Sequence, residues 1–581
     1  MSISTDLSSV ARSLPLRQKL AILILSIVAT ASLLAVLWQL NNSILIGVPE
    51  NGGILREGLI GAPRFINPLL AISDTDRDLS AVIYSGLMRK GTAGQYIPDL
   101  AERFDISPDG KTYTFYLRKN LTWHDGKPVT AHDVVFTINQ AVNPSVKSPR
   151  AGNWEGVAVS AKSDRVVSFT LPQPYSAFIG DVTMGILPSH IWGNIPAETL
   201  AFSELNTHPI GSGPYMIKSI ENSGAGLPLY YSLTSFKDFA LGNPHIEEIR
   251  FYFYPNEAEL ITAREKGAID NLGGITPEAA KKLARFGADI KQTPLPRVFG
   301  IFWNQNEAKI FTQAEVRKTL DESLDRKYIV ENILEDFATV IDSPLPPSSL
   351  GYEKKLTLSE PIGLRIQQAK NTLTRAGWKP GPDGVLQKTV GKETLRLEFT
   401  ITTADTAELK AIATLAKNTW EKMGAKVNIK IQDVADLQQS SIRPRKYDAL
   451  LFGMSTSADS DLYSFWHSRE RADPGLNVAM YANPTADKLL EKIKTEQNRE
   501  VLTTDIKKLA IEIKKDQPAV FIYAPDFIYV ISDDIRHMDL PFISIPADRL
   551  AHIYDWYLET DKVWPIFAPT IKTATSTIET N

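Results

Sequence analysis

A serine between two glycines is the first group in the sequence that could do chemistry. In a nucleophile elbow, G-x-S-x-G, a sharp turn exposes such a serine for acyl transfer. Gly211-Ser212-Gly213 lacks the first glycine of that motif, because position 210 is Ile210. The motif therefore does not predict a serine hydrolase. The two glycines permit a close approach of the backbone, either to a crossing segment or to a ligand.

Zinc chemistry would require histidines at short, regular spacing, as in H-E-x-x-H. None of the eight histidines has a partner at that spacing. They are His124, His132, His190, His208, His245, His467, His537 and His552. The sequence also contains neither a phosphate-binding loop nor a dinucleotide fingerprint. We therefore expect no metal site and no cofactor.

Two neighbouring carboxylates are the remaining candidate for catalysis. Asp459 and Asp461 lie two residues apart in a loop and could act as an acid pair in a hydrolase. The alternative is structural, because such residues also cap the start of a helix, here over residues 462–467.

The elements that must position these side chains are clearest in residues 101–144. Apolar and polar residues alternate over residues 112–118, which predicts a half-buried strand, and residues 121–123 continue into a second short strand. Thr130 and Asp133 have the spacing of a capping box, with an apolar helix face behind them. The residue pattern of this stretch alone indicates a structural unit with no catalytic or metal-binding motif.

The end of the chain shows three further elements. The periodicity predicts one long amphipathic helix over residues 485–516. Apolar runs at residues 519–523 and 527–530 predict two strands that return to the first lobe of the chain.

The same scaffold carries a resemblance. The string DG-x-TYTF-x-LR followed by HDGKP-x-TA-x-DV, within residues 109–134, resembles the signature of the family 5 extracellular solute-binding proteins of ABC transporters. That class holds dipeptide-, oligopeptide- and nickel-binding proteins. Further landmarks follow in family order over residues 44–560. They are Ile66-Asn67-Pro68-Leu69-Leu70, Ser85-Gly86-Leu87-Met88, Pro98-Asp99-Leu100-Ala101, Gly211-Ser212-Gly213-Pro214-Tyr215, Ala314-Glu315-Val316-Arg317-Lys318, Ala376-Gly377-Trp378 and Tyr447-Asp448.

Length and composition agree with such a protein. A chain of 581 residues is too long for one core and should divide into at least two lobes. With 22% charged residues and a formal charge of -4, the chain has no basic excess. Nucleic acid is therefore not an expected partner.

The N-terminus predicts a membrane segment. Arg12, Arg17 and Lys19 precede an uncharged run over residues 20–40, long enough to cross the roughly 30 Å of a bilayer core. The basic flank places the rest of the chain outside the membrane. Ala29-Thr30-Ala31 offers a signal-peptidase site, so a cleaved signal is the alternative to an anchor. Many family members are tethered through a lipidated cysteine, but this chain has no cysteine.

The resemblance implies an α/β, two-lobed periplasmic-binding-protein-like fold with an extra subdomain, behind the N-terminal helix. The expected boundaries are 1–19 for a cytoplasmic N-terminus, 20–40 for the transmembrane anchor or signal, 44–75 with 211–297 and 524–560 for the main sheet of lobe I, 76–210 for the extra subdomain, 298–523 for lobe II, and 566–581 for a disordered tail.

By resemblance, the loop after Tyr447-Asp448 is where peptide-binding relatives carry the aspartate that binds the ligand's amine. That position falls near Thr456 here, which has no carboxylate, and Asp459 could take the role after a local shift. Arg297 is the cation that we would test for an anionic ligand terminus. The complete set of expected ligand-binding residues is Phe65, Asn67, Trp154, Gly211, Ser212, Gly213, Arg297, Trp303, Asn304, Thr456, Asp459 and Trp466. Any single aromatic among them could equally be core.

The function implied is capture of a peptide or similar small solute by closure of two lobes, and its delivery to ABC permease subunits. We expect a monomer on the extracytoplasmic side of the cell membrane that catalyses no reaction. A ligand sensor with the same fold is the first alternative, and permease genes beside this one would argue against it. A hydrolase using Asp459 and Asp461 is the second.

Overall fold

The computed structural model describes residues 15–567, except 93, 176, 355–359, 457–461 and 497. The predictions for the first 14 residues, for Asp459 and Asp461, and for the tail from residue 568 lie outside the described residues. The chain divides into two compact units, Gly53–Trp556 and a smaller unit of Met1–Gly52 with Tyr557–Asn581.

The smaller unit contains the apolar N-terminal segment. Helix α2 (Leu16–Ile44) is long and apolar enough to cross a membrane, and none of its residues is buried. Strand β1 (Ile46–Glu50) pairs antiparallel with β23 (Glu559–Val563). The two ends of the described chain therefore meet in one two-stranded sheet.

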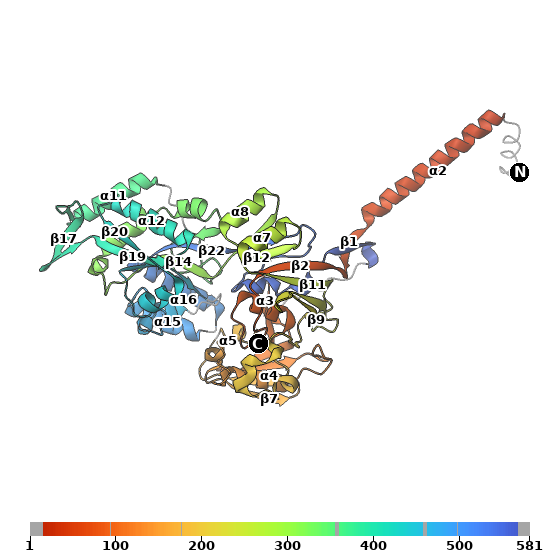
Figure 1. The fold of residues 1–581 in the computed structure, drawn as a ribbon, viewed down its shortest axis with the longest axis horizontal. Coiled ribbons are helices and arrows are strands. Elements are labelled where there is room, and N and C mark those ends of the chain that lie inside the picture. Colours follow the sequence, from red (N-terminus) through yellow and green to blue (C-terminus); the bar gives the residue numbers. More distant parts are fainter. Residues whose placement is uncertain are drawn as a thin grey trace. The chain divides into compact units, whose positions relative to one another are not determined.

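The larger unit is built on a twelve-stranded sheet (Figure 1). Along the sheet its strands are β20 (Lys426–Gln432), β19 (Glu398–Ala404), β21 (Ala449–Ser455), β14 (Arg297–Trp303), β22 (Ala519–Ile531), β12 (Asn271–Gly273), β2 (Gly52–Ile60), β11 (Ile246–Tyr254), β10 (Pro228–Ser235) and β9 (Tyr215–Asn222), while β13 (Asp289–Pro294) and β15 (Ala338–Val340) also pair with β22. We call the strands β2 and β9 to β13 lobe I, and β14, β15 and β19 to β21 lobe II. The chain thus has the expected two-lobed α/β fold.

Strand β22 belongs to both lobes. Its first half pairs with β14 and β15 of lobe II, and its second half pairs with β12 and β13 of lobe I. The two strands predicted over this segment are therefore one continuous strand, and the first of them was wrongly predicted to return to the first lobe, because it pairs with β14 in lobe II. Pro525 does not break the strand, because its carbonyl accepts a hydrogen bond from the Leu295 N–H at 2.9 Å and Asp526 resumes pairing at once.

Helices cover each lobe. In lobe I these are α7 (Glu257–Glu265) and α8 (Pro277–Arg285), and in lobe II they are α9 (Ala314–Ser323), α11 (Ile362–Arg375), α12 (Ala407–Glu421), α15 (Pro484–Thr495) and α16 (Arg499–Asp516). The prediction of one helix over residues 485–516 was wrong. The Asn498 side chain accepts hydrogen bonds from the N–H groups of Glu500 and Val501, and this N-cap starts a second helix.

A separate four-stranded sheet, in the order β5 (Ala101–Ile106), β6 (Thr112–Leu117), β8 (Val166–Thr170) and β7 (Ala158–Ser163), packs with helix α4 (Ala131–Val142). The alternation predicted for β6 is confirmed, and the Asp133 carboxylate accepts a hydrogen bond from the Thr130 N–H at 2.8 Å, as a capping box requires. Residues 121–123 form only an isolated bridge, from Thr122 to Pro128, and not a strand. The domain boundaries set out above remain predictions.

Candidate functional site

Two of the expected ligand-binding residues lie at the junction of the two lobes. Arg297 begins β14 and lies opposite Ser455, the last residue of β21. Thr456 follows at once and is buried, and both its N–H and its hydroxyl donate to the Pro296 carbonyl, at 2.8 and 3.1 Å. Arg297 and Thr456 are therefore neighbours, with the Arg297 side chain exposed and the Thr456 hydroxyl already used.

Three other candidates lie deep in lobe II. Trp303, at the far end of β14 and roughly 20 Å from Arg297 by strand rise, stacks on Phe311 with ring centroids 4.5 Å apart. Asn304 is buried and its side-chain amide donates to the Arg445 carbonyl at 2.7 Å. Trp466 is fully buried among other aromatic rings. These contacts account for the Asn304 amide and for the packing of both rings, whereas the indole N–H groups of Trp303 and Trp466 are buried without a hydrogen-bond partner among the described residues.

The glycine motif lies against the end of helix α3 (Asp74–Ile83). The Gly213 N–H donates to the Ile83 carbonyl at 2.8 Å. A Cβ added at Gly211 would lie 1.9 Å from that same oxygen. Of the two alternatives for these glycines, close approach to the chain's own backbone is the one that the geometry displays. Ser212 lies between them with its side chain buried, and no described residue hydrogen-bonds its Oγ.

His124, from the HDGKP part of the signature, fastens this turn from the other side. The Gly211 N–H donates to Nδ1 at 3.2 Å, which leaves the proton on Nε2, 3.0 Å from the Gly213 carbonyl. Burial lowers the pKa of His124 to about 4, although the hydrogen bond to Gly213 and the charge of Asp125 oppose this shift. A neutral, partly buried imidazole with both nitrogens hydrogen-bonded has a structural role in holding this turn.

Phe65 lies near the start of α3, and Asn67 follows two residues later in the chain. The Phe65 N–H donates to the Asp76 carboxylate at 2.9 Å, and its ring is half-buried. Asn67 is fully buried; its amide donates to Asn206 at 3.2 Å and its oxygen accepts from the Leu69 N–H. The structure therefore gives Asn67 a complete set of internal partners.

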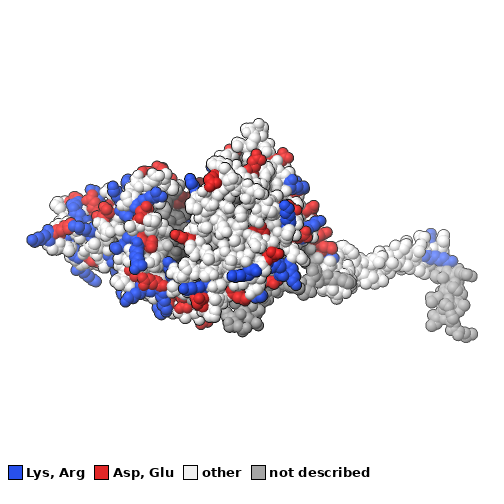
Figure 2. All heavy atoms as spheres, turned by 90° about the horizontal axis from the view of Figure 1, so that it is seen from below, with Lys and Arg blue, Asp and Glu red and all other residues white. Residues whose placement is uncertain are grey.

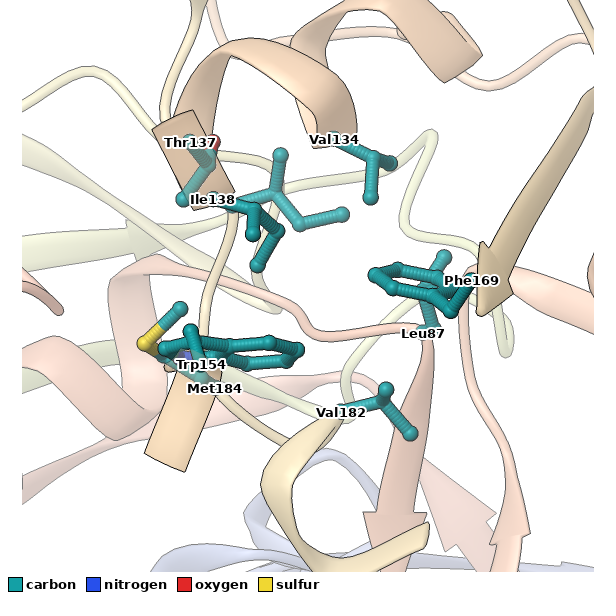
Figure 3. Close-up of a pocket in the computed structure, with 9 residues that line it drawn as sticks. Leu87, Val134, Thr137, Ile138, Trp154, Phe169, Val182 and Met184 are labelled. Atoms are coloured by element: carbon teal, nitrogen blue, oxygen red, sulfur yellow. The ribbon is translucent and has the colours of Figure 1, made fainter. Parts of the chain in front are cut away.

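Trp154 lines an apolar pocket beside helix α4 and strand β8 (Figure 3). The other lining residues are Leu87, Val134, Thr137, Ile138, Phe169, Val182, Met184 and Ile186. The hydroxyl of Thr137, the one polar side chain besides the indole, donates to the Asp133 carbonyl and accepts from the Leu187 N–H. This lining offers a ligand no free polar group apart from the indole.

The eleven candidates within the described residues therefore do not form one cluster. Arg297 and Thr456 lie next to each other at the lobe junction, the glycine motif lies at the C-terminal end of α3, and Trp303 and Trp466 lie in the core of lobe II. Their assignment as ligand-binding residues remains a prediction. A carboxylate that the sequence analysis missed lies close to the lobe junction: Asp526 is the single charged residue in the 13 residues of β22. A single charged residue in an otherwise apolar strand could have been identified from the sequence as a candidate functional residue.

Charge and metal chemistry give no competing site within the described part of the chain. There, no group of three or more histidines and carboxylates is arranged to hold a metal ion. Figure 2 shows Lys and Arg interspersed with Asp and Glu on the visible face, without a broad patch of one sign. This visible face therefore offers no broad basic surface suited to a polyanion.

The comparisons with known proteins all match this chain to solute-binding proteins. Residues 95–473 match the family model described as bacterial extracellular solute-binding proteins, family 5. The oligopeptide-binding protein AppA of Bacillus subtilis is 29% identical over 526 residues, which are 88% of this chain and 93% of that protein. The dipeptide-binding protein of Escherichia coli is 26% identical over 55% of this chain and 63% of its own length.

Solved structures show the same likeness. AppA of Bacillus subtilis in complex with a nonapeptide superposes with a TM-score of 0.65 at 27% identity, covering 88% of this chain and all of that one. The substrate-binding protein CtaP of Listeria monocytogenes reaches a TM-score of 0.73 at 25% identity, with the same coverage. NikZ of Campylobacter jejuni, solved with a nickel–histidine complex, has a TM-score of 0.67 at 24% identity and shares the fold.

Proposed function

Because this chain belongs to the bacterial extracellular solute-binding proteins of family 5, we propose that it captures peptides outside the cell membrane and delivers them to an ABC permease. The observation that carries the proposal is the match to oligopeptide-binding AppA over 88% of the chain. The working motion is closure of lobe I and lobe II, hinged at residues 294–297 and within β22.

This fold suits a ligand of varied sequence. A bound peptide must satisfy its main-chain N–H and C=O groups, because each one buried without a partner costs about 1 to 3 kcal/mol. Hydrogen bonds to exposed strand edges or loops between the two lobes satisfy these main-chain groups whatever the side chains of the peptide are. The ligand is released unchanged, so we propose that the chain acts as a monomeric carrier and not as an enzyme.

The ligand class can be tested by native mass spectrometry of the full-length chain, purified in mild detergent without refolding. We expect co-purified small molecules whose fragment spectra are those of peptides. Protein emptied by unfolding and refolding is the control, and it should regain the bound masses only when peptides are added back. Recovery of a sugar, haem or nickel complex would contradict the proposal. Shortening of the added peptides would show an enzyme instead.

We further propose that α2 anchors the mature protein in the membrane. Its length and apolar composition allow a span, and the basic residues Arg17 and Lys19 at its start favour an extracytoplasmic globular part. The full chain should then stay in the membrane pellet after alkaline carbonate extraction, whereas a variant lacking residues 1–42 should be soluble. A mature protein that begins at Ser32, directly after the Ala29-Thr30-Ala31 site, would show cleavage and contradict the anchor.

A further inference from the structure

Asp526 has an unusual environment for a carboxylate. Its Oδ1 is buried and has no hydrogen-bond partner among the described residues, although the residue as a whole is only partly buried. A buried carboxylate oxygen normally accepts a hydrogen bond or pairs with a cation, because an unpaired one loses its hydration without compensation. Asp526 therefore has unused capacity to accept.

The residue lies where β22 passes from one lobe to the other. Its N–H donates to the Phe337 carbonyl at 3.1 Å on the lobe II side, and in register it lies opposite Pro294 of β13 in lobe I. The segment from Pro294 to Arg297 separates Asp526 from Thr456, which binds the Pro296 carbonyl. Two strand spacings, roughly 10 Å, therefore separate Asp526 from Thr456.

Cations on the neighbouring segments are engaged elsewhere or point to solvent. Lys291 on β13 pairs with Asp289 at 3.1 Å, and Lys281 on α8 pairs with Glu335. The Arg297 side chain is exposed. Burial, with no neighbouring charge to offset it, raises the pKa of Asp526 to about 6.

We propose that Asp526 is a ligand-binding residue that accepts a hydrogen bond from a cationic nitrogen of the bound solute, a terminal ammonium or a lysine side chain. The inference rests on the proposed function, because it needs a solute between the lobes. It assigns the ligand's positive charge to a strand that both lobes share. Occupation of that position would supply Asp526 with its missing partner.

The test uses full-length protein in detergent and three synthetic mixtures of random tetrapeptides to hexapeptides. The first mixture has free N-termini and no Lys or Arg, the second is acetylated and has no Lys or Arg, and the third is acetylated and contains Lys. We expect the wild-type chain to bind the first or the third about 10- to 100-fold more tightly than the second, the ratio for one charge-assisted hydrogen bond. Tighter binding of the first mixture would identify the terminal ammonium as the partner of Asp526, and tighter binding of the third would identify a lysine side chain.

The Asp526→Asn variant should bind all three mixtures with the affinity that the wild type has for the second mixture. Binding of that mixture shows that the variant is folded, and Asp526→Glu should restore part of the preference. Asp336→Asn is the matched control, because Asp336 is an exposed carboxylate next to Phe337. Its backbone is left-handed, a conformation that asparagine also adopts readily.

The outcomes separate the inference from the function it rests on. Equal binding of all mixtures by the wild type, or a preference that survives in Asp526→Asn, would overturn the inference and leave peptide binding intact. No binding of any mixture by the wild type would overturn both.

Discussion

Replacing Arg549 with methionine is expected to lower the free energy of unfolding by about 3 to 5 kcal/mol, the cost of leaving buried charges without their partner. Arg549 donates to Glu57 at 2.8 Å and to both oxygens of Asp78 at 2.8 and 2.7 Å, and all three side chains are at most 3% exposed. Methionine fills a similar volume but leaves two carboxylates unpaired. Urea denaturation of the full-length chain measures the loss.

The same substitution should be sensitive to pH. Burial raises the pKa of Asp78 to about 6 even though Arg549 lowers it, and without Arg549 that pKa should rise further. An aspartate in an unfolded chain titrates near 3.9. A folded pKa above that value contributes stability that is lost as the pH rises through it, so the deficit of the variant should be larger at pH 8 than at pH 5.

Arg103→Met is the matched control for this prediction. Arg103 pairs with Asp105 at 3.1 Å, but both side chains are more than half exposed. An exposed ion pair contributes little to stability because water screens it, so this variant should unfold almost as the wild type does. Equal losses in the two variants would show that burial of the Arg549 cluster is not what makes it stabilising.

Replacing Gly211 with alanine is the second change with a large expected effect, a loss of about 4 kcal/mol or more. The added Cβ would lie 1.9 Å from the Ile83 carbonyl oxygen. The turn cannot move aside easily, because His124 binds it through the Gly211 N–H and carbonyl, and Gly213 is itself bonded to Ile83. Thermal unfolding of the full-length chain, followed by circular dichroism, should show a much lower midpoint.

Gly224→Ala is the control for the glycine prediction. A Cβ at Gly224 meets no atom within 4 Å, and its backbone is not left-handed. Alanine there should be neutral or stabilise by up to about 1 kcal/mol, because it restricts the unfolded chain. A Gly211→Ala variant that melts at the temperature of the wild type would contradict the steric argument and reopen ligand approach as the reason for the glycine.

These two predictions concern how the parts of lobe I are held together. Arg549 connects a late segment of the chain to β2 and α3, and Gly211 lets the chain return to lobe I against the end of that same helix. Helix α3 is thus held at its middle, through Asp78, and at its C-terminal end, through Ile83, by residues that the sequence places far away. A carrier that closes two lobes needs each lobe to move as a rigid body, and these contacts provide that rigidity.

The local elements were largely predictable from the sequence, because their causes are local. Alternation over residues 112–118 predicts β6, the Thr130 and Asp133 pair predicts the start of α4, and the long apolar run predicts α2. Two predictions of local elements were wrong. The Asn498 side chain caps a second helix and so divides the predicted one, and backbone hydrogen bonds keep β22 continuous through Pro525.

The sequence by itself determined the family, through an ordered series of motifs, and with it the two-lobed fold and the solute-binding class. Only the tertiary structure decided which polar groups already have partners. In the described structure the Thr456 hydroxyl donates to the Pro296 carbonyl and the Asn67 amide donates to Asn206, whereas Oδ1 of Asp526 has no partner among the described residues. The physical reason is that these partners lie up to hundreds of residues apart in the chain, so no local pattern records them. They meet only when the strands of the two lobes assemble around β22.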